Sequence, residues 1–224
     1  MTELRIVGGR SRAEPRAALA EGLVIALAVH GGYHLAALPG HPEAVAVARA
    51  RSSTSLHEAP FQLMVGLGAQ AMAQASEWSR ETRILTDRMW PGPLTVVVPS
   101  QALAADGSGD GVVRITLPAS RALRALCRAC GPVALLALRH PDGRPLVARE
   151  EVCARFTGND IALVVDGGTC RGPGPTVVDC TASPPVVCRV GAFPESYVDA
   201  ALIMGNRRAR WRTKRAGPDA ASLS

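Results

Sequence analysis

The sequence is 224 residues long, carries a formal net charge of +6, and is 47% apolar but only 4% aromatic. This length suits one large domain, and apolar residues that are mostly Ala, Val and Leu favour helices packed on a buried sheet over an aromatic-rich sandwich. No apolar run reaches the roughly 18 residues of a membrane helix, and the N-terminus lacks a signal-peptide layout. We therefore expect a cytoplasmic protein that does not enter a membrane.

Short apolar runs alternate with helical segments along the chain, separated by Gly, Pro and polar turn residues. The run at 23–29 is continuous and apolar, which is typical of a strand covered on both faces. We expect strands at 23–29, 61–65, 94–98, 112–117, 133–138, 161–165, 176–179 and 186–189, the last two paired with each other. We expect helices at 13–21, 42–51, 69–75, 79–89, 120–130, 148–155 and 194–204. This alternation predicts an α/β (α+β) domain, a mixed sheet with helical cover.

The positive charge is concentrated at the C-terminus. Residues 205–224 contain six basic residues and one acid, hence +5, whereas the rest of the chain contains 19 basic and 18 acidic residues, hence +1. We therefore divide the chain into a folded domain, residues 1–204, and a basic, disordered tail, residues 205–224. The stretch from Arg207 to Arg215, which includes Trp211, suits phosphate contact and base stacking on RNA. A solvated tail without a ligand is the alternative interpretation.

Six cysteines are present, but a domain with its own core does not depend on disulfides, and the cytoplasm keeps thiols reduced. Cys127 and Cys130 have the spacing of half a zinc site. No second Cys or His pair completes that site in the sequence, so we expect no metal and interpret the cysteines as buried or half-buried thiols.

Five motifs follow one another in a fixed order. Trp-Pro-Gly-Pro-Leu-Thr at 90–95 opens a strand, Arg114 lies within the next strand, and Gly-Pro-Val at 131–133 starts another. Asp-Gly-Gly at 166–168 precedes Thr-Val-Val-Asp at 176–179, and Arg-Val-Gly-Ala follows at 189–192. This succession, which covers roughly 17–204, resembles the YrdC-like family of L-threonylcarbamoyl-AMP synthases.

The resemblance implies a twisted, open mixed sheet folded around a concave, basic cavity. It also implies condensation of threonine, bicarbonate and ATP into threonylcarbamoyl-AMP with release of pyrophosphate, followed by transfer of the threonylcarbamoyl group to tRNA. ATP would then be a substrate, either alone or as its Mg²⁺ complex, and no tightly bound cofactor is expected. A triphosphate requires several Arg or Lys donors.

Carried over position by position, the resemblance assigns two sets of residues. The expected nucleotide- and phosphate-binding residues are Arg49, Arg51, Arg114, Thr176 and Arg189. The expected substrate pocket contains Tyr33, His30 and Arg139, with His34 beside them. The alternatives are ordinary ones: solvated arginines at a helix end for Arg49 and Arg51, and structural histidines for His30 and His34.

Several polar positions of the family are changed in this chain. A Thr-Asp-Thr segment reads His30-Gly31-Gly32, a Ser-Ala-Asn segment reads Ala137-Leu138-Arg139, and a serine is replaced by Pro175. Each lost partner costs about 1–3 kcal/mol when its ligand group stays unsatisfied. Three hypotheses follow: a divergent synthase of the nucleotidyltransferase type, a non-catalytic module that binds a nucleotide or RNA, or an enzyme with another amino acid or acyl acceptor. His30, His34 and Arg139 are candidates to replace the lost polar groups.

Overall fold

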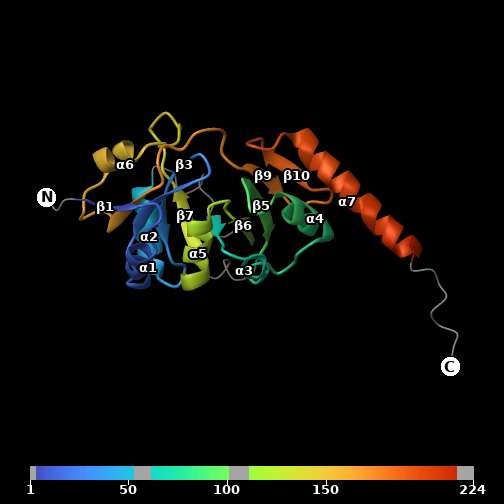
Figure 1. The fold of residues 1–224 in the computed structure, drawn as a ribbon, viewed down its shortest axis with the longest axis horizontal. Coiled ribbons are helices and arrows are strands. Elements are labelled where there is room, and N and C mark those ends of the chain that lie inside the picture. The colour runs from blue at the N-terminus through green and yellow to red at the C-terminus, as the bar shows by residue number, and fades with distance from the viewer. Residues whose placement is uncertain (1–3, 53–61, 101–110, 216–224) are drawn as a thin grey trace, which may run out of the picture.

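The computed structural model describes residues 4–52, 62–100 and 111–215, with side chains as far as Gly205. Within these ranges ten strands form a single mixed sheet, and seven helices pack around it (Figure 1). The strands are β1 (Arg5–Gly8), β2 (Ile25–Val29), β3 (Gly32–Ala37), β4 (Gln62–Met64), β5 (Leu94–Pro99), β6 (Val112–Thr116), β7 (Val133–Ala137), β8 (Leu163–Asp166), β9 (Thr176–Asp179) and β10 (Val186–Arg189). The helices are α1 (Ala13–Ala20), α2 (Pro42–Arg51), α3 (Gly68–Met72), α4 (Arg80–Met89), α5 (Arg121–Cys130), α6 (Arg149–Arg155) and α7 (Glu195–Arg215).

The strands lie in the order β1-β8-β2-β3-β7-β4-β6-β5-β9-β10. Neighbours that are distant in sequence, such as β4 with β6 and β5 with β9, are parallel, whereas β2 with β3 and β9 with β10 are antiparallel. The mixed sheet and the pairing of the last two strands are therefore as the sequence predicts. The predicted loops at 53–60 and 105–110 lie outside the described residues.

Two strands escape sequence-based prediction. β1 is a short edge strand that pairs only with β8. β3 follows β2 after a two-residue turn, His30-Gly31, in which both residues have positive φ, 30° and 84°. This is the geometry of a type I′ hairpin turn. Gly31 thus belongs to the turn of a hairpin, and Gly32 is the first residue of β3.

Helices cover the two halves of the sheet differently. In the half formed by β2, β3, β7 and β8, one core packs against α1 and α5 and another against α2 and α6. Ile25 and Leu27 belong to the first core and Ala26 to the second, so β2 is covered on both faces as its apolar run predicts. In the other half, α4 and α7 pack on the face that carries Val113 and Ile115.

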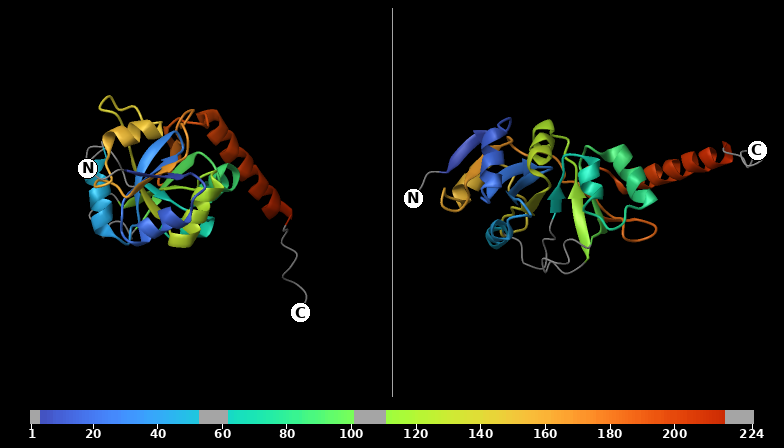
Figure 2. Two further views of the ribbon diagram at one scale, coloured as in Figure 1. Left: turned by 60° about the vertical axis from the view of Figure 1, so that its left-hand side comes forward. Right: turned by 90° about the horizontal axis from the view of Figure 1, so that it is seen from below.

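Helix α7 extends beyond Met204, where the sequence places the end of the last helix. It packs against α4, and a Cβ on Gly205 would lie 2.5 Å from the Ile84 side chain, so the two helices approach closely there. The helix then continues away from the body of the protein to Arg215 (Figures 1 and 2). The first part of the expected disordered tail, 205–215, is therefore helical, and 216–224 lie outside the described residues. No helix within the described chain is long and apolar enough to cross a membrane.

Replacement of Ile115 by alanine should strongly destabilise the fold. Ile115 is 0% exposed in the middle of β6, so truncation leaves a cavity, and we expect a loss of about 2–5 kcal/mol in the free energy of unfolding. The matched control is Ile203→Ala on α7, where the side chain is 56% exposed and the change should stay within about 0.5 kcal/mol. Urea unfolding measures both, and equal effects would contradict this description of the core.

Candidate functional site

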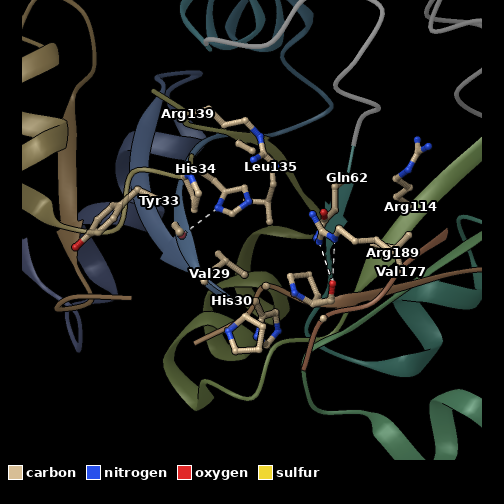
Figure 3. A pocket seen from close by; sticks show the side chains of 18 of the residues that line it. Val29, His30, Tyr33, His34, Gln62, Arg114, Leu135, Arg139, Val177 and Arg189 are labelled. Carbon is tan, nitrogen blue, oxygen red and sulfur yellow. Dashed lines mark hydrogen bonds between the residues drawn. The ribbon is translucent and has the colours of Figure 1, made fainter. Parts of the chain in front are cut away.

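A cavity of about 510 Å³ opens on the side of the sheet that Arg114 faces. Strands β3, β4, β6, β7, β9 and β10 contribute to its wall, with the β2–β3 turn and the segment 172–175 (Figure 3). The volume falls within the roughly 300–1,000 Å³ that small-molecule pockets occupy. The polar side chains among its lining residues are His30, Tyr33, His34, Gln62, Arg114, Arg139, Cys188 and Arg189.

Positive charge dominates this cavity. Arg114 lies in the middle of β6, Arg139 follows β7, and Arg189 ends β10, so folding brings together three arginines that are distant in sequence. Among the described residues that line it, none is Asp or Glu. Because the positive charges of Arg139 and Arg189 repel each other, an anion bound beside them would be stabilised.

Arg189 is held in place by a backbone carbonyl. Its Nε and Nη2 atoms donate to the carbonyl oxygen of Pro175 at 3.2 and 2.9 Å (Figure 3). Burial lowers the pKa of Arg189, and the neighbouring charge of Arg139 lowers it further. A group with five N–H donors that is fixed at a cavity wall is well suited to bind a phosphate or a carboxylate.

The two histidines contribute neutral polar groups. His30 occupies the strained first position of the β2–β3 turn, and its Nε2 is buried with no hydrogen-bond partner among the described residues. His34 has its Nδ1 3.2 Å from the carbonyl oxygen of Gly32, which assigns the proton to Nδ1. Burial, assisted by the charges of His30, Arg139 and Arg189, lowers the pKa of His34 to about 4. His34 is therefore an uncharged imidazole at neutral pH.

Tyr33 and Thr176 serve mainly to hold the protein together. The fully buried Tyr33 points away from the arginines (Figure 3), its hydroxyl donates to the carbonyl of Gly168 at 3.2 Å, and burial raises its pKa to about 12. The Thr176 hydroxyl donates to the carbonyl of Phe193 at 2.7 Å and accepts from the amides of Gly191 and Phe193 at 3.0 and 2.9 Å. Thr176 is not among the described lining residues, and these three hydrogen bonds use the full capacity of its hydroxyl. Its assignment to the phosphate site stays a prediction.

The assignment of Arg49 and Arg51 to the phosphate site also stays a prediction. Both lie on α2, which packs against β3 and β7, and neither is a lining residue. The Arg51 guanidinium donates to the carbonyl of Asp160 and lies 3.8 Å from its carboxylate. Arg139 does line the cavity, and its Nη1 donates to the carbonyl of Gly143 at 2.8 Å.

Gln62 is the lining residue that sequence reasoning missed. It lies opposite Arg114 in the register of the parallel strands β4 and β6, and its amide donates to Thr95 at 3.5 Å. Gln62 is a single polar residue inside an apolar strand, which is the same sequence pattern that indicated a cavity position for Arg114. The changed family positions are also here: Gly31, Ala137 and Pro175 line the cavity, so its wall is apolar at three positions where the resemblance implied polar groups.

Comparisons with known proteins agree with this architecture. The Sua5/YciO/YrdC family model, described as Telomere recombination, matches residues 17–191. A threonylcarbamoyl-AMP synthase of Pyrococcus abyssi is 30% identical over 148 residues, which are 64% of this chain and 43% of that protein. A threonylcarbamoyl-AMP synthase of Vibrio cholerae is 28% identical over 171 residues, which are 72% of this chain and 87% of that protein.

Solved structures share the fold. The crystal structure of P. abyssi Sua5 complexed with L-threonine has a TM-score of 0.78 and 25% identity, over 89% of this chain and 61% of that chain. E. coli YciO has a TM-score of 0.73 over 87% of this chain and 98% of that chain, and its 19% identity supports the fold alone. The predicted twisted, open mixed sheet is thereby confirmed. The chain spans less than two thirds of the length of the Pyrococcus protein.

Replacement of Thr176 by valine should destabilise the protein without acting on a ligand. Valine keeps the shape but leaves the amides of Gly191 and Phe193 without their acceptor, so we expect a loss of about 2–4 kcal/mol in the free energy of unfolding. Thr181→Val, at an exposed position, is the control and should cost less than about 1 kcal/mol. Denaturant unfolding measures both free energies, and a Thr176→Val chain as stable as the parent would contradict this structural role of the hydroxyl.

Replacement of His34 by glutamine should flatten the acid limb of the stability curve. The folded chain holds the pKa of His34 at about 4, below the unfolded value of 6.5, so unfolding takes up a proton between these values. The contribution of His34 to the free energy of unfolding is fully present above about pH 7. About 3 kcal/mol of it is lost as the pH falls to about 4. Unfolding free energies across this pH range test the prediction, and parallel curves for the two chains would contradict it.

Proposed function

Because this chain belongs to the Sua5/YciO/YrdC family, we propose that its basic cavity binds the phosphates of a nucleotide, as ATP or an adenylate, for chemistry related to threonylcarbamoyl-AMP synthesis. The observation that carries the proposal is the lining of the cavity: Arg114, Arg139 and Arg189 all line it, and no carboxylate is found among the described residues of its wall. Guanidinium groups bind phosphate oxygens in pairs of parallel hydrogen bonds, which fixes orientation as well as charge.

The reaction would consume ATP, bicarbonate and threonine and release threonylcarbamoyl-AMP and pyrophosphate. The arginines would stabilise negative charge on the phosphates, and most of the catalysis would be positioning of the reactants. Mg²⁺ would be held by the phosphates of ATP, because the cavity lining supplies no carboxylate. We place this activity in the cytoplasm, where ATP and tRNA are available.

The amino-acid side of the cavity supports a changed specificity. A P. abyssi relative has been crystallised with L-threonine, which supports an amino acid as the second ligand. In this chain Gly31 and Ala137 stand where the family has polar residues, and the buried Nε2 of His30 has no partner among the described residues. His30 and Arg139 would therefore provide the polar contacts to the amino acid.

Nucleotide binding without turnover is the second candidate function. The apolar wall at Ala137 and Pro175 favours it, because the groups that would orient the second substrate are absent from these positions. Pyrophosphate release in the presence of ATP, bicarbonate and threonine distinguishes the two functions. Release dependent on an amino acid supports the enzyme, and ATP binding without release supports the binding module.

The double variant Arg114→Met/Arg189→Met should lose nucleotide affinity by about 100-fold. Each lost charge-assisted hydrogen bond is worth about 1.5 kcal/mol, or about tenfold in affinity. The matched control is Arg80→Met/Arg121→Met, which removes the same charge from exposed positions on α4 and α5 and should bind as the parent does. Isothermal titration with ATP and AMP measures both, and no detectable binding by the parent chain would overturn the proposal.

A further inference from the structure

A second cavity, of about 450 Å³, lies between helices α3, α4 and α5. None of its lining residues is shared with the first cavity. Its aromatic and charged lining residues are Trp78, Arg83, Asp87, Trp90, Arg124 and Arg128.

This cavity lies beyond the carboxyl ends of β4 and β6. These neighbouring strands are parallel, and the residues that follow them, Gly66 and Leu117, both line the cavity. In open α/β sheets the space outside the carboxyl ends of parallel strands is a frequent ligand site. Gly66 also lets α5 pack directly on the strand end, since a Cβ there would lie 2.4 Å from the carbonyl oxygen of Arg124. The cavity is thus formed by close packing of regular elements.

Two tryptophans provide an aromatic surface. The rings of Trp78 and Trp90 have centroids 6.1 Å apart and are tilted by 49°, and both side chains are half-buried. The indole N–H of Trp90 donates to the carbonyl of Leu94 at 2.9 Å, so the polar atom of this ring is already satisfied. At the rim, Leu67 and Met72 are 45% and 44% exposed. What the tryptophans offer a ligand is therefore ring surface for stacking.

Three arginines surround this aromatic surface. Arg124 is fixed, because its Nη1 donates to the carbonyls of Pro118 and Ala119 at 2.7 and 2.6 Å, while Arg83 and Arg128 are exposed. Within the described chain none of the three forms an ion pair, and Asp87 is the one carboxylate among the lining residues. The lining therefore carries a net positive charge, with a single acceptor beside the aromatic rings.

We propose that this second cavity binds a nucleobase with its adjoining phosphate, supplied by a single RNA strand or by a free nucleotide. Stacking on tryptophan and charge contact with arginine are the two interactions by which proteins hold single-stranded nucleic acid. Asp87 can accept a hydrogen bond from an exocyclic amino group of the base. The proposal is independent of the function proposed for the first cavity, because the two share no lining residue.

The position of α7 favours an RNA strand as the source. α7 packs against α4, the helix that carries Arg83 and Asp87, and then continues to Arg215. Six of the residues from Arg207 to Arg215 are basic. A strand bound in the cavity would extend across α4 toward this basic helix.

The test is the affinity of the full chain for a fluorescein-labelled single-stranded oligoribonucleotide of ten nucleotides, with AMP as the second probe. The variant Arg83→Gln/Arg128→Gln should lose at least tenfold in affinity for the oligonucleotide. Its salt dependence, the slope of log K against log salt, should fall by about 1.4, or about 0.7 for each phosphate contact. The control Arg80→Gln/Arg121→Gln removes equal charge from the same two helices outside the cavity and should behave as the parent does.

Stacking is measured separately by quenching of tryptophan fluorescence in a Trp211→Phe background, which leaves Trp78 and Trp90 as the two emitters. Trp78→Ala should abolish part of the quenching and weaken binding at least tenfold. Because Trp78 also packs against the core, the arginine pair carries the test if this variant is unstable.

The outcomes separate the possibilities. Tight oligonucleotide binding with weak AMP binding, both sensitive to Arg83 and Arg128, identifies an RNA site. AMP binding as tight as that of the oligonucleotide, with the same sensitivity, identifies a free-nucleotide site. The proposal is overturned if neither probe binds, if the matched control loses as much affinity, or if binding depends on Arg114 and Arg189 instead.

Discussion

A guanidinium group in the middle of an apolar strand must be paired or reach a polar space, because an isolated buried charge is very unfavourable. Arg114 occupies that position in β6, between Val113 and Ile115, which are buried on the opposite face under α4 and α7. The alternation of side chains along a strand therefore places Arg114 on the other face, where the basic cavity lies. Gln62 lies beside Arg114 in the adjacent strand β4, and the basic cavity is the space that this arrangement keeps open.

The outline of that cavity depends on close backbone contacts. A Cβ on Gly31 would lie 2.9 Å from the Cα of Gly174, and a Cβ on Gly191 would lie 2.3 Å from the carbonyl oxygen of Gly174. The segment 172–175 is therefore packed between the β2–β3 turn and the end of β10. This packing presents the Pro175 carbonyl to Arg189, so the proline that replaces a family serine still orients a charged side chain through its backbone.

The two cavities use different parts of the same two strands. Gln62 and Arg114 line the first cavity from the face of the sheet, whereas Gly66 and Leu117 line the second from the strand ends. Leu117 follows Arg114 by three positions of extended chain, a distance of about 10 Å. The sheet can thus hold two positively charged sites apart, one surrounded by small and apolar residues and the other by tryptophan rings.

The sequence by itself determined the order of most helices and strands, the family, and the presence of Arg114 and Arg189 at a site, because apolar periodicity and motif order are local properties of the chain. The sequence did not predict β3, because glycine-rich residues occur both in a type I′ turn and after the end of a strand. It also placed Thr176 at a phosphate site, whereas only the folded chain brings to its hydroxyl the backbone groups with which it forms hydrogen bonds. The second cavity was decided by the tertiary structure alone. Trp78, Trp90 and the arginines of α4 and α5 lie around one cavity because two parallel strands end side by side and Gly66 allows α5 to pack closely. The spacing of these residues along the chain does not predict that they lie together.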